Sequence, residues 1–425
     1  MKAKPFIHIF LLCSSILPCH SQLTIEECYR KARNNYPLIK QYGLIEKSEA
    51  YNLENARRGY LPQVRFTAQA TYQSDVTEIP FNATQLGIPG LHIPTVDRDQ
   101  YKMEIGIEQA IWDGGAVRSQ KKLLQAEADV NRKGTDTDLY AVNARVNQIF
   151  FGILLADAQL AQNKVLQSDL QRNCSQVASY IKNGIAHQSD LDALRVELLK
   201  AKQAEAQIAH TRQAYAAMLS QLIGEDIGRN TIFVKPDIPE TTAVRSNNRP
   251  ELALFDAQIR QLEAQEGRIK AGLMPRIGLF LTGGYGKPGL DMLENGFKAY
   301  YIAGLRLSWD IGNFWTKKNN QLNIKNSINT VEAQRETFLL NTALETTGSN
   351  AAIERYREQM EYDDEIIRLQ ESVRQASEAK MANGTLSGTE LTRDIHAEQS
   401  ARQDKIIHEM ELLMAIYDLK HATGN

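Results

Sequence analysis

The most constraining feature of this 425-residue sequence is an internal repeat. The motif Asn34-Asn35-Tyr36-Pro37 returns as Asn247-Asn248-Arg249-Pro250, Trp112-Asp113-Gly114-Gly115 returns as Trp309-Asp310-Ile311-Gly312, and Asn183-Gly184 returns as Asn383-Gly384. Glycine and proline mark turns and helix ends, so the same order of elements is encoded twice. Each half is predicted to contain a helix, a strand, a loop, a second strand, and then two long helices joined by a turn.

Long helices are predicted where proline is absent, from Pro94 to Pro236 and from Pro288 to the end of the chain. Both stretches are rich in strong helix formers such as Ala, Leu, Gln, Lys and Glu. Residues seven apart form an apolar stripe with polar interruptions: Leu194, Ala201, Ile208, Tyr215 and Leu222, beside Leu191, Leu198, Glu205, Arg212 and Leu219. This pattern is typical of helices that pack side by side as in coiled coils.

Four segments instead alternate between apolar and polar residues, which predicts strands with one apolar and one polar face. We expect them over residues 62–74, 99–112, 275–286 and 299–310. Their length of about ten residues matches a tilted membrane crossing. Four strands are too few to close a barrel, which needs about eight, so either they form an open sheet or several chains pool their strands.

The N-terminus has the pattern of a secretory signal over residues 1–21. Lys2 and Lys4 precede an apolar run over residues 6–12, and small residues precede the expected cleavage after Ser21. No later stretch supplies about 18 consecutive apolar residues, so we expect no transmembrane helix in the remaining chain.

Composition narrows the function class. The formal net charge is −2, which argues against nucleic acid as a partner because that interaction needs a basic surface. Of the four cysteines, Cys28 and Cys174 remain after the signal; they either pair or serve as small core residues of helices. No catalytic constellation can be assembled, and we expect no cofactor or metal, so an enzyme is the least supported class.

The repeated motifs, extended by Asp190-Leu191 and Glu390-Leu391 after the two Asn-Gly pairs, resemble those of the outer membrane efflux protein (TolC) family over both halves. The resemblance implies an α+β membrane protein with long antiparallel helical hairpins and a homotrimer. In that trimer each chain gives four strands to a 12-stranded β-barrel in the outer membrane of a Gram-negative bacterium. It also implies the exit duct of a tripartite efflux or type I secretion system, with a periplasmic adaptor protein and an inner-membrane pump as partners.

Two other functions stay open from the residues: a periplasmic or surface coiled-coil structural protein, and a diffusion porin without a pump. The expected organisation is a signal peptide over 1–21, a first repeat over 22–223, an equatorial linker over 224–246 and a second repeat over 247–425. The helical hairpins are expected over residues 114–222 and 313–423, with tips near 183–190 and 383–390.

The hairpin tips are candidate entrance or gate residues: Gly184, Ser189, Asp190, Gly384, Thr389 and Glu390. Gly184 and Gly384 are expected to end one helix, while Ser189-Asp190 and Thr389-Glu390 are expected to cap the next. In a trimer, Asp190 and Glu390 would form rings of like charge that favour cations, including divalent ions. The second tip has no basic residue between Gly384 and Glu390, which argues against an arginine latch like that of some relatives.

The strands supply further candidates. Five charged residues on the polar face are expected to line the lumen of the barrel: Arg65, Lys102, Glu104, Glu108 and Arg306. The three tryptophans, Trp112, Trp309 and Trp315, fall at or just past strand ends, where an interfacial belt in contact with outer-membrane lipid would lie. The loops over residues 74–99 and 287–298 are expected outside the cell.

Overall fold

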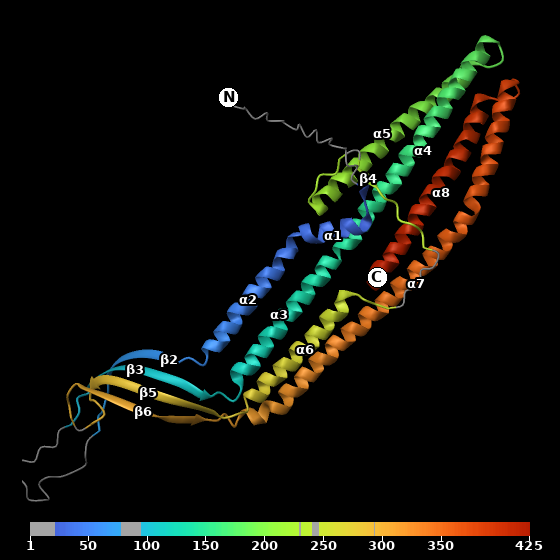
Figure 1. Cartoon of the computed structure of the whole chain (residues 1–425). Helices are drawn as coiled ribbons and strands as arrows, with labels where there is room; N and C mark the ends of the chain where they lie inside the picture. The colour runs from blue at the N-terminus through green and yellow to red at the C-terminus, as the bar shows by residue number, and fades with distance from the viewer. Residues whose placement is uncertain (1–21, 78–94, 229–230, 240–245, 293) are drawn as a thin grey trace, which may run out of the picture. The chain divides into compact units, whose positions relative to one another are not determined.

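A computed structural model of the protein describes residues 22–77, 95–228, 231–239, 246–292 and 294–425 (Figure 1). The expected signal peptide, residues 1–21, lies outside the described residues. The chain forms two compact units. Unit 1 comprises residues 1–39, 136–250 and 338–425, and unit 2 comprises residues 40–135 and 251–337. Each unit takes segments from both sequence repeats, so the repeats interleave in space.

Unit 2 contains a four-stranded antiparallel sheet, in the order β2-β3-β5-β6 (Figure 1). The strands are β2 (Gln63–Tyr72), β3 (Asp99–Trp112), β5 (Arg276–Lys287) and β6 (Lys298–Ser308). They begin and end within two residues of the bounds expected from the alternation. Helices α2 (Lys40–Arg58) and α6 (Pro250–Ala271) precede the strand pairs, and α3 (Ala116–Tyr140) and α7 (Asn313–Ala382) follow them.

Strand register separates the two faces of the sheet. Arg65 lies opposite Gly106, and Glu104 lies opposite both Thr67 and Gly284, so the polar residues share one face. The other face is apolar and exposed in the single chain, with Phe66 at 64% and Tyr301 at 76% of full exposure. Its other large exposed residues are Val64, Tyr72, Met103, Ile105, Leu279, Leu281, Leu305 and Leu307. Such a face is typical of a sheet that contacts lipid.

Unit 1 contains the two helical hairpins. The first is α4 (Val142–Lys182) with α5 (Gln188–Ile223), and the second is the part of α7 from Phe338 onward with α8 (Gly388–Thr423). Short elements complete the unit: α1 (Ile25–Asn35), the 3-10 helix η1 (Pro37–Ile39), and β1 (Gln22–Leu23), which pairs in parallel with β4 (Ile232–Phe233) from the expected linker. One core joins these elements, through Ile25, Phe150, Phe151, Leu219, Phe233, Leu413 and Ile416.

The expected heptad stripe packs as the sequence indicates. Leu191, Leu194, Ala201 and Leu219 are buried. The polar interruptions contact polar residues of α4: Glu205 accepts a hydrogen bond from the Gln167 amide at 2.7 Å, and Arg212 pairs with Asp157 at 2.5 Å. The interruptions therefore fix the register of α4 against α5, since each needs one particular partner.

One stretch of the described helices, within Ala116–Lys182, contains an 18-residue window that is apolar enough to cross a membrane by composition. Half of that window is buried inside the protein, and core helices of soluble proteins pass the same test. The fully buried Phe150 and Phe151 lie in this stretch, within the core of unit 1.

The two described cysteines are both free, so the disulfide alternative is wrong. Cys28 is buried in the core of unit 1, and Cys174 is partly buried on α4. Desolvation by burial raises the pKa of the Cys28 thiol to about 12. Cys28 is therefore an inert core residue.

Candidate functional site

Both hairpins turn in the same way after their first helix. Gly184 and Gly384 have φ values of +73° and +69°, a left-handed conformation that favours glycine. The amide of Gly184 donates to the Ile181 carbonyl, and that of the next residue, Ile185, donates to Tyr180. The equivalent pair at the second tip is Gly384 to Met381 and Thr385 to Lys380. These bonds close the C-termini of α4 and α7 in the Schellman arrangement, as the Asn-Gly pairs indicate.

The expected caps of the second helices are wrong by two residues. Ser189 and Thr389 were expected at the cap, but the N-cap residues are His187 and Ser387. Asp190 and Glu390 occupy the third helical position, and each carboxylate accepts from the backbone amide of its N-cap residue, at 2.9 and 3.1 Å. Ser387 returns the bond by accepting from the Glu390 amide at 3.3 Å. The exposed Ser189 and Thr389 lie inside the first turns instead.

Asp190 also connects the two tips. Its second carboxylate oxygen, Oδ1, accepts from the backbone amide of Gly388 at 2.8 Å, so the start of α5 is bonded to the start of α8. Gly388 is buried, and a Cβ added there would lie 2.6 Å from the Asp190 Cα. The contact therefore requires both a carboxylate at residue 190 and a glycine at residue 388. We call this pair the tip junction.

Glu390 lies differently. Its side chain is exposed, and Oε2 accepts from both the amide and the hydroxyl of Ser387. These hydrogen bonds, first from the Ser387 backbone and then from its side chain, lower the pKa of Glu390. The carboxylate therefore stays charged well below neutral pH, and no described contact ties it to the other hairpin.

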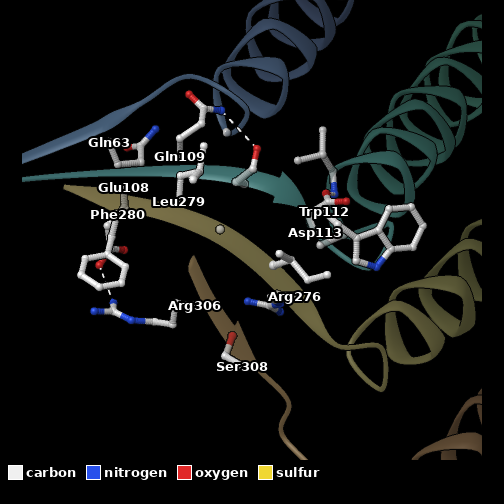
Figure 2. A pocket seen from close by; sticks show the side chains of 16 residues that line it. Gln63, Glu108, Gln109, Trp112, Asp113, Arg276, Leu279, Phe280, Arg306 and Ser308 are labelled. Atoms are coloured by element: carbon white, nitrogen blue, oxygen red, sulfur yellow. Dashed lines mark hydrogen bonds and ion pairs between the residues drawn. The ribbon is translucent and has the colours of Figure 1, made fainter. Parts of the chain in front are cut away.

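On the polar face of the sheet, two sets of side-chain contacts connect β6 to β3 across β5, and we call them the two braces. In the first, the Tyr300 hydroxyl of β6 donates to Glu104 of β3 at 2.9 Å, and Lys102 pairs with the same carboxylate at 2.8 Å. In the second, Arg306 of β6 pairs with Glu108 of β3 at 2.8 Å (Figure 2). The Arg306 guanidinium lies 4.7 Å from the centroid of the Phe280 ring on the strand between. Strand register places Arg65 on the same face, so the five charged residues that were expected to share one face of the sheet do so.

Glycines allow the aromatic rings of these braces to lie close to the sheet. Tyr300 is the register partner of Gly284, and Phe280 is the register partner of Gly304. A Cβ at Gly284 would lie 2.3 Å from the Tyr300 ring, and a Cβ at Gly304 would lie 3.0 Å from the Phe280 ring. Each ring thus covers the backbone of the neighbouring strand. A cavity of about 300 Å³ opens beside this region, lined among others by Glu108, Phe280, Arg276 and Arg306 (Figure 2).

The tryptophans lie where the strands end. Trp112 is the last residue of β3, Trp309 follows β6 directly, and Trp315 lies in the first turn of α7. The Trp309 indole donates to the carbonyl of Leu273 at 3.0 Å, so its polar end is satisfied while much of the ring stays exposed. Trp315 is 85% exposed, which is unusual for so large an apolar side chain.

In the described part of the chain, no group of three or more His, Cys, Asp or Glu side chains could hold a metal ion. His396 lies 2.7 Å from Glu197 of α5, and His408 lies 3.0 Å from Asp363 of α7, so both histidines connect α8 to a neighbouring helix.

Sequence reasoning missed several residues that the structure places in these sites. Ser387 was missed although it forms, with the predicted Glu390, the Ser-x-x-Glu spacing of a capping box, which was readable in the sequence. Gly388, Phe280 and Tyr300 carry no comparable signal, because their roles depend on which strands and tips come together in space.

Comparisons with known proteins agree with this architecture. The sequence profile described as outer membrane efflux protein matches residues 28–225 and 245–425. A comparison with curated protein sequences gave no significant match.

Solved structures share the fold. A membrane protein from Pseudomonas aeruginosa is similar with a TM-score of 0.68 at 15% identity, over 94% of this chain and 90% of that chain. The Campylobacter jejuni CmeC outer membrane channel gives 0.66 at 14% identity, over 94% and 85%. The open state of the Neisseria gonorrhoeae MtrE outer membrane channel gives 0.64 at 16% identity, over 94% and 89%. The profile match extends over most of the chain, and the chain therefore belongs to the outer membrane efflux protein family, whose members are channels of the Gram-negative outer membrane and not enzymes.

Proposed function

We propose that three copies of this chain form the exit duct of a tripartite efflux or type I secretion system. The observation that carries the proposal is the sheet of unit 2, which exposes a continuous apolar face and leaves one edge of β2 and one edge of β6 unpaired in the described chain. Open edges and four strands cannot span a bilayer, whereas three chains supply a closed 12-stranded barrel. In that barrel the apolar face contacts lipid and the polar face lines the lumen.

The helical hairpins support a partner-dependent duct over a simple porin. Helices α4 and α5 contain 41 and 36 residues, so the first hairpin is about 55–60 Å long at about 1.5 Å per residue. A barrel that only admits solutes has no use for helices of this length. We place the tips at the periplasmic entrance, where a periplasmic adaptor and an inner-membrane pump would engage them. The three tryptophans then mark the interface between lipid and water.

A trimer is the first expected result. Purified in mild detergent, the mature chain should elute as a trimer that resists SDS or is captured by crosslinking, and its circular dichroism should be dominated by helix. The physical reason is that the β2 and β6 edges are satisfied only by a neighbouring copy. Light scattering measures the mass directly. A monodisperse monomer would contradict the exit-duct proposal.

The loop between β5 and β6 should lie outside the cell, because both strands continue into helices at their other ends. Met292 is exposed in this loop, so Met292→Cys should react with a membrane-impermeant maleimide on intact cells. The expected outer loop 74–99 lies largely outside the described residues, Thr84 included. A matched control is Ile185→Cys, exposed at the first tip, which should react only after the outer membrane is broken. The reverse labelling order would invert the topology.

The exposed Glu390 should favour cations at the entrance. Three copies in a trimer would form a carboxylate ring, which attracts cations and increases block by divalent ions. Glu390→Gln removes the charge and keeps an amide oxygen that can accept from Ser387, so the helix start is preserved. We expect weaker cation selectivity and weaker divalent block in planar bilayers, with trimer yield unchanged. An unchanged reversal potential would leave Glu390 with a capping role alone.

A further inference from the structure

The charge on the polar face of the sheet is unbalanced. Strand register places five basic and two acidic side chains there: Arg65, Lys102, Arg276, Lys298 and Arg306, against Glu104 and Glu108. The formal charge of the whole chain is only −2, so this excess is a local property of the sheet.

Most of the basic side chains are neutralised by neighbours. Lys102 pairs with Glu104, and Arg306 pairs with Glu108. Lys298 pairs with Glu294 from the loop that precedes β6. In the described part of the chain, Arg65 and Arg276 have no ion-pair partner. Asp113, which lines the same cavity as Arg276, uses its carboxylate oxygens to accept from the amides of Gly115 and Val117.

A neighbouring copy would not neutralise these two arginines through the sheet. This step rests on the proposed trimer, in which β6 of one chain pairs with β2 of the next. The polar face of β2 carries Gln63, Arg65, Thr67, Gln69 and Thr71, and that of β6 carries Lys298, Tyr300, Ile302, Gly304, Arg306 and Ser308. Neither set contains a carboxylate, so the seam between copies adds no acidic partner.

We propose that Arg65 and Arg276 give the barrel lumen a positive potential that selects anionic cargo, meaning solutes that carry carboxylate, sulfonate or phosphate groups. Rings of arginine are the usual means of favouring anions in pores, and charges that line a narrow passage raise the local concentration of opposite charge. Six unpaired guanidinium groups in the trimer act on solutes after they have passed the entrance. The barrel lumen therefore favours anions, whereas the Glu390 ring at the entrance favours cations.

The local potential can be measured at Thr282, whose register partner Gly106 also faces Arg65. Thr282→Cys is made in a Cys174→Ser background, which leaves only the buried Cys28 in the described chain. Purified trimers are treated with 2-sulfonatoethyl methanethiosulfonate or with its trimethylammonium analogue. Each rate is divided by the rate with a free thiol. We expect the anionic reagent to be favoured about three- to tenfold at low salt, and the preference to decrease as salt is added.

Two double variants distinguish the cause. Arg65→Gln with Arg276→Gln should reduce the preference to about one. Glu108→Gln with Arg306→Gln removes one charge of each sign and should leave the preference unchanged. A wild-type ratio near one, or an equal effect of both double variants, would overturn the assignment while the duct itself stands. If the cysteine reacts only with a lipid-soluble maleimide, the polar face does not line a lumen, and the proposed function fails together with this inference.

Discussion

Asp190→Ala is expected to separate the two hairpin tips of each chain and to raise the ion leak through the trimer. The substitution removes the acceptor of the Gly388 amide and the acceptor of the His187 amide together. A buried amide left without a partner costs about 1–3 kcal/mol, which corresponds to a change of roughly 5- to 150-fold in the ratio of joined to separated tips. Leak conductance in planar bilayers and sensitivity of cells to a large antibiotic measure this ratio.

The tip junction can also be broken from its other side. Gly388→Ala keeps both acceptors but places a Cβ 2.6 Å from the Asp190 Cα, so the two backbones must move apart. We expect the same leak as for Asp190→Ala. Thr389→Ala is the matched control, because Thr389 is the exposed next residue in the same turn. If Asp190→Ala and Gly388→Ala conduct like Thr389→Ala, the junction does not hold the entrance.

Asparagine is not a neutral replacement at residue 190, although it removes only the charge. Asp190 accepts one bond at each oxygen, from His187 and from Gly388, and an amide has one oxygen and one donor group. In Asp190→Asn, the side-chain NH₂ group therefore faces one of these two backbone amides, and that hydrogen bond is lost. Glu390 receives both of its described bonds at the same oxygen, so Glu390→Gln is the clean test of charge.

The elements of this fold could be predicted from the sequence because each carries a local signal. The period of two in residues such as Val64 and Phe66 predicts β2 and its faces, and the absence of proline predicts the long helices. The glycines at 184 and 384 end the first helix of each hairpin because only glycine enters the left-handed conformation at little cost. These signals depend on neighbours in sequence, so they were readable without the structure.

What could not be predicted depends on contacts between distant segments. The β3–β5 pairing joins the two repeats, and nothing in the alternation of either strand specifies Glu104 opposite Gly284. The tip junction joins Asp190 to Gly388 of the other repeat, and a repeat comparison shows which residues correspond in sequence but not which ones are in contact. The caps were misplaced because Ser189 and Thr389 are of residue types that favour the N-cap, and they follow the true caps by two residues.

Gly284→Ala is expected to move the Tyr300 ring off the sheet and to narrow the barrel. The added Cβ would lie 2.3 Å from the ring carbon that bears the hydroxyl, and 2.6 Å from the hydroxyl oxygen. The backbone of β5 lies beneath the ring, so we expect the ring to move away from the sheet, toward the proposed lumen. It then loses the hydrogen bond to Glu104, and the crowding costs about 1–3 kcal/mol of trimer stability. We expect a lower single-channel conductance in planar bilayers and a lower temperature for the thermal unfolding of the trimer.

The neighbouring Gly283 supplies the matched control for this prediction. It lies on the opposite face of β5, and a Cβ there meets nothing within 4 Å in the described chain, so Gly283→Ala should leave conductance unchanged. The double variant Gly284→Ala with Tyr300→Ala should recover the conductance, because the ring that was displaced is gone. If Gly284→Ala lowers conductance equally with and without Tyr300, the backbone of β5 and not the ring is responsible, and the role assigned to the tyrosine–glycine pair is wrong.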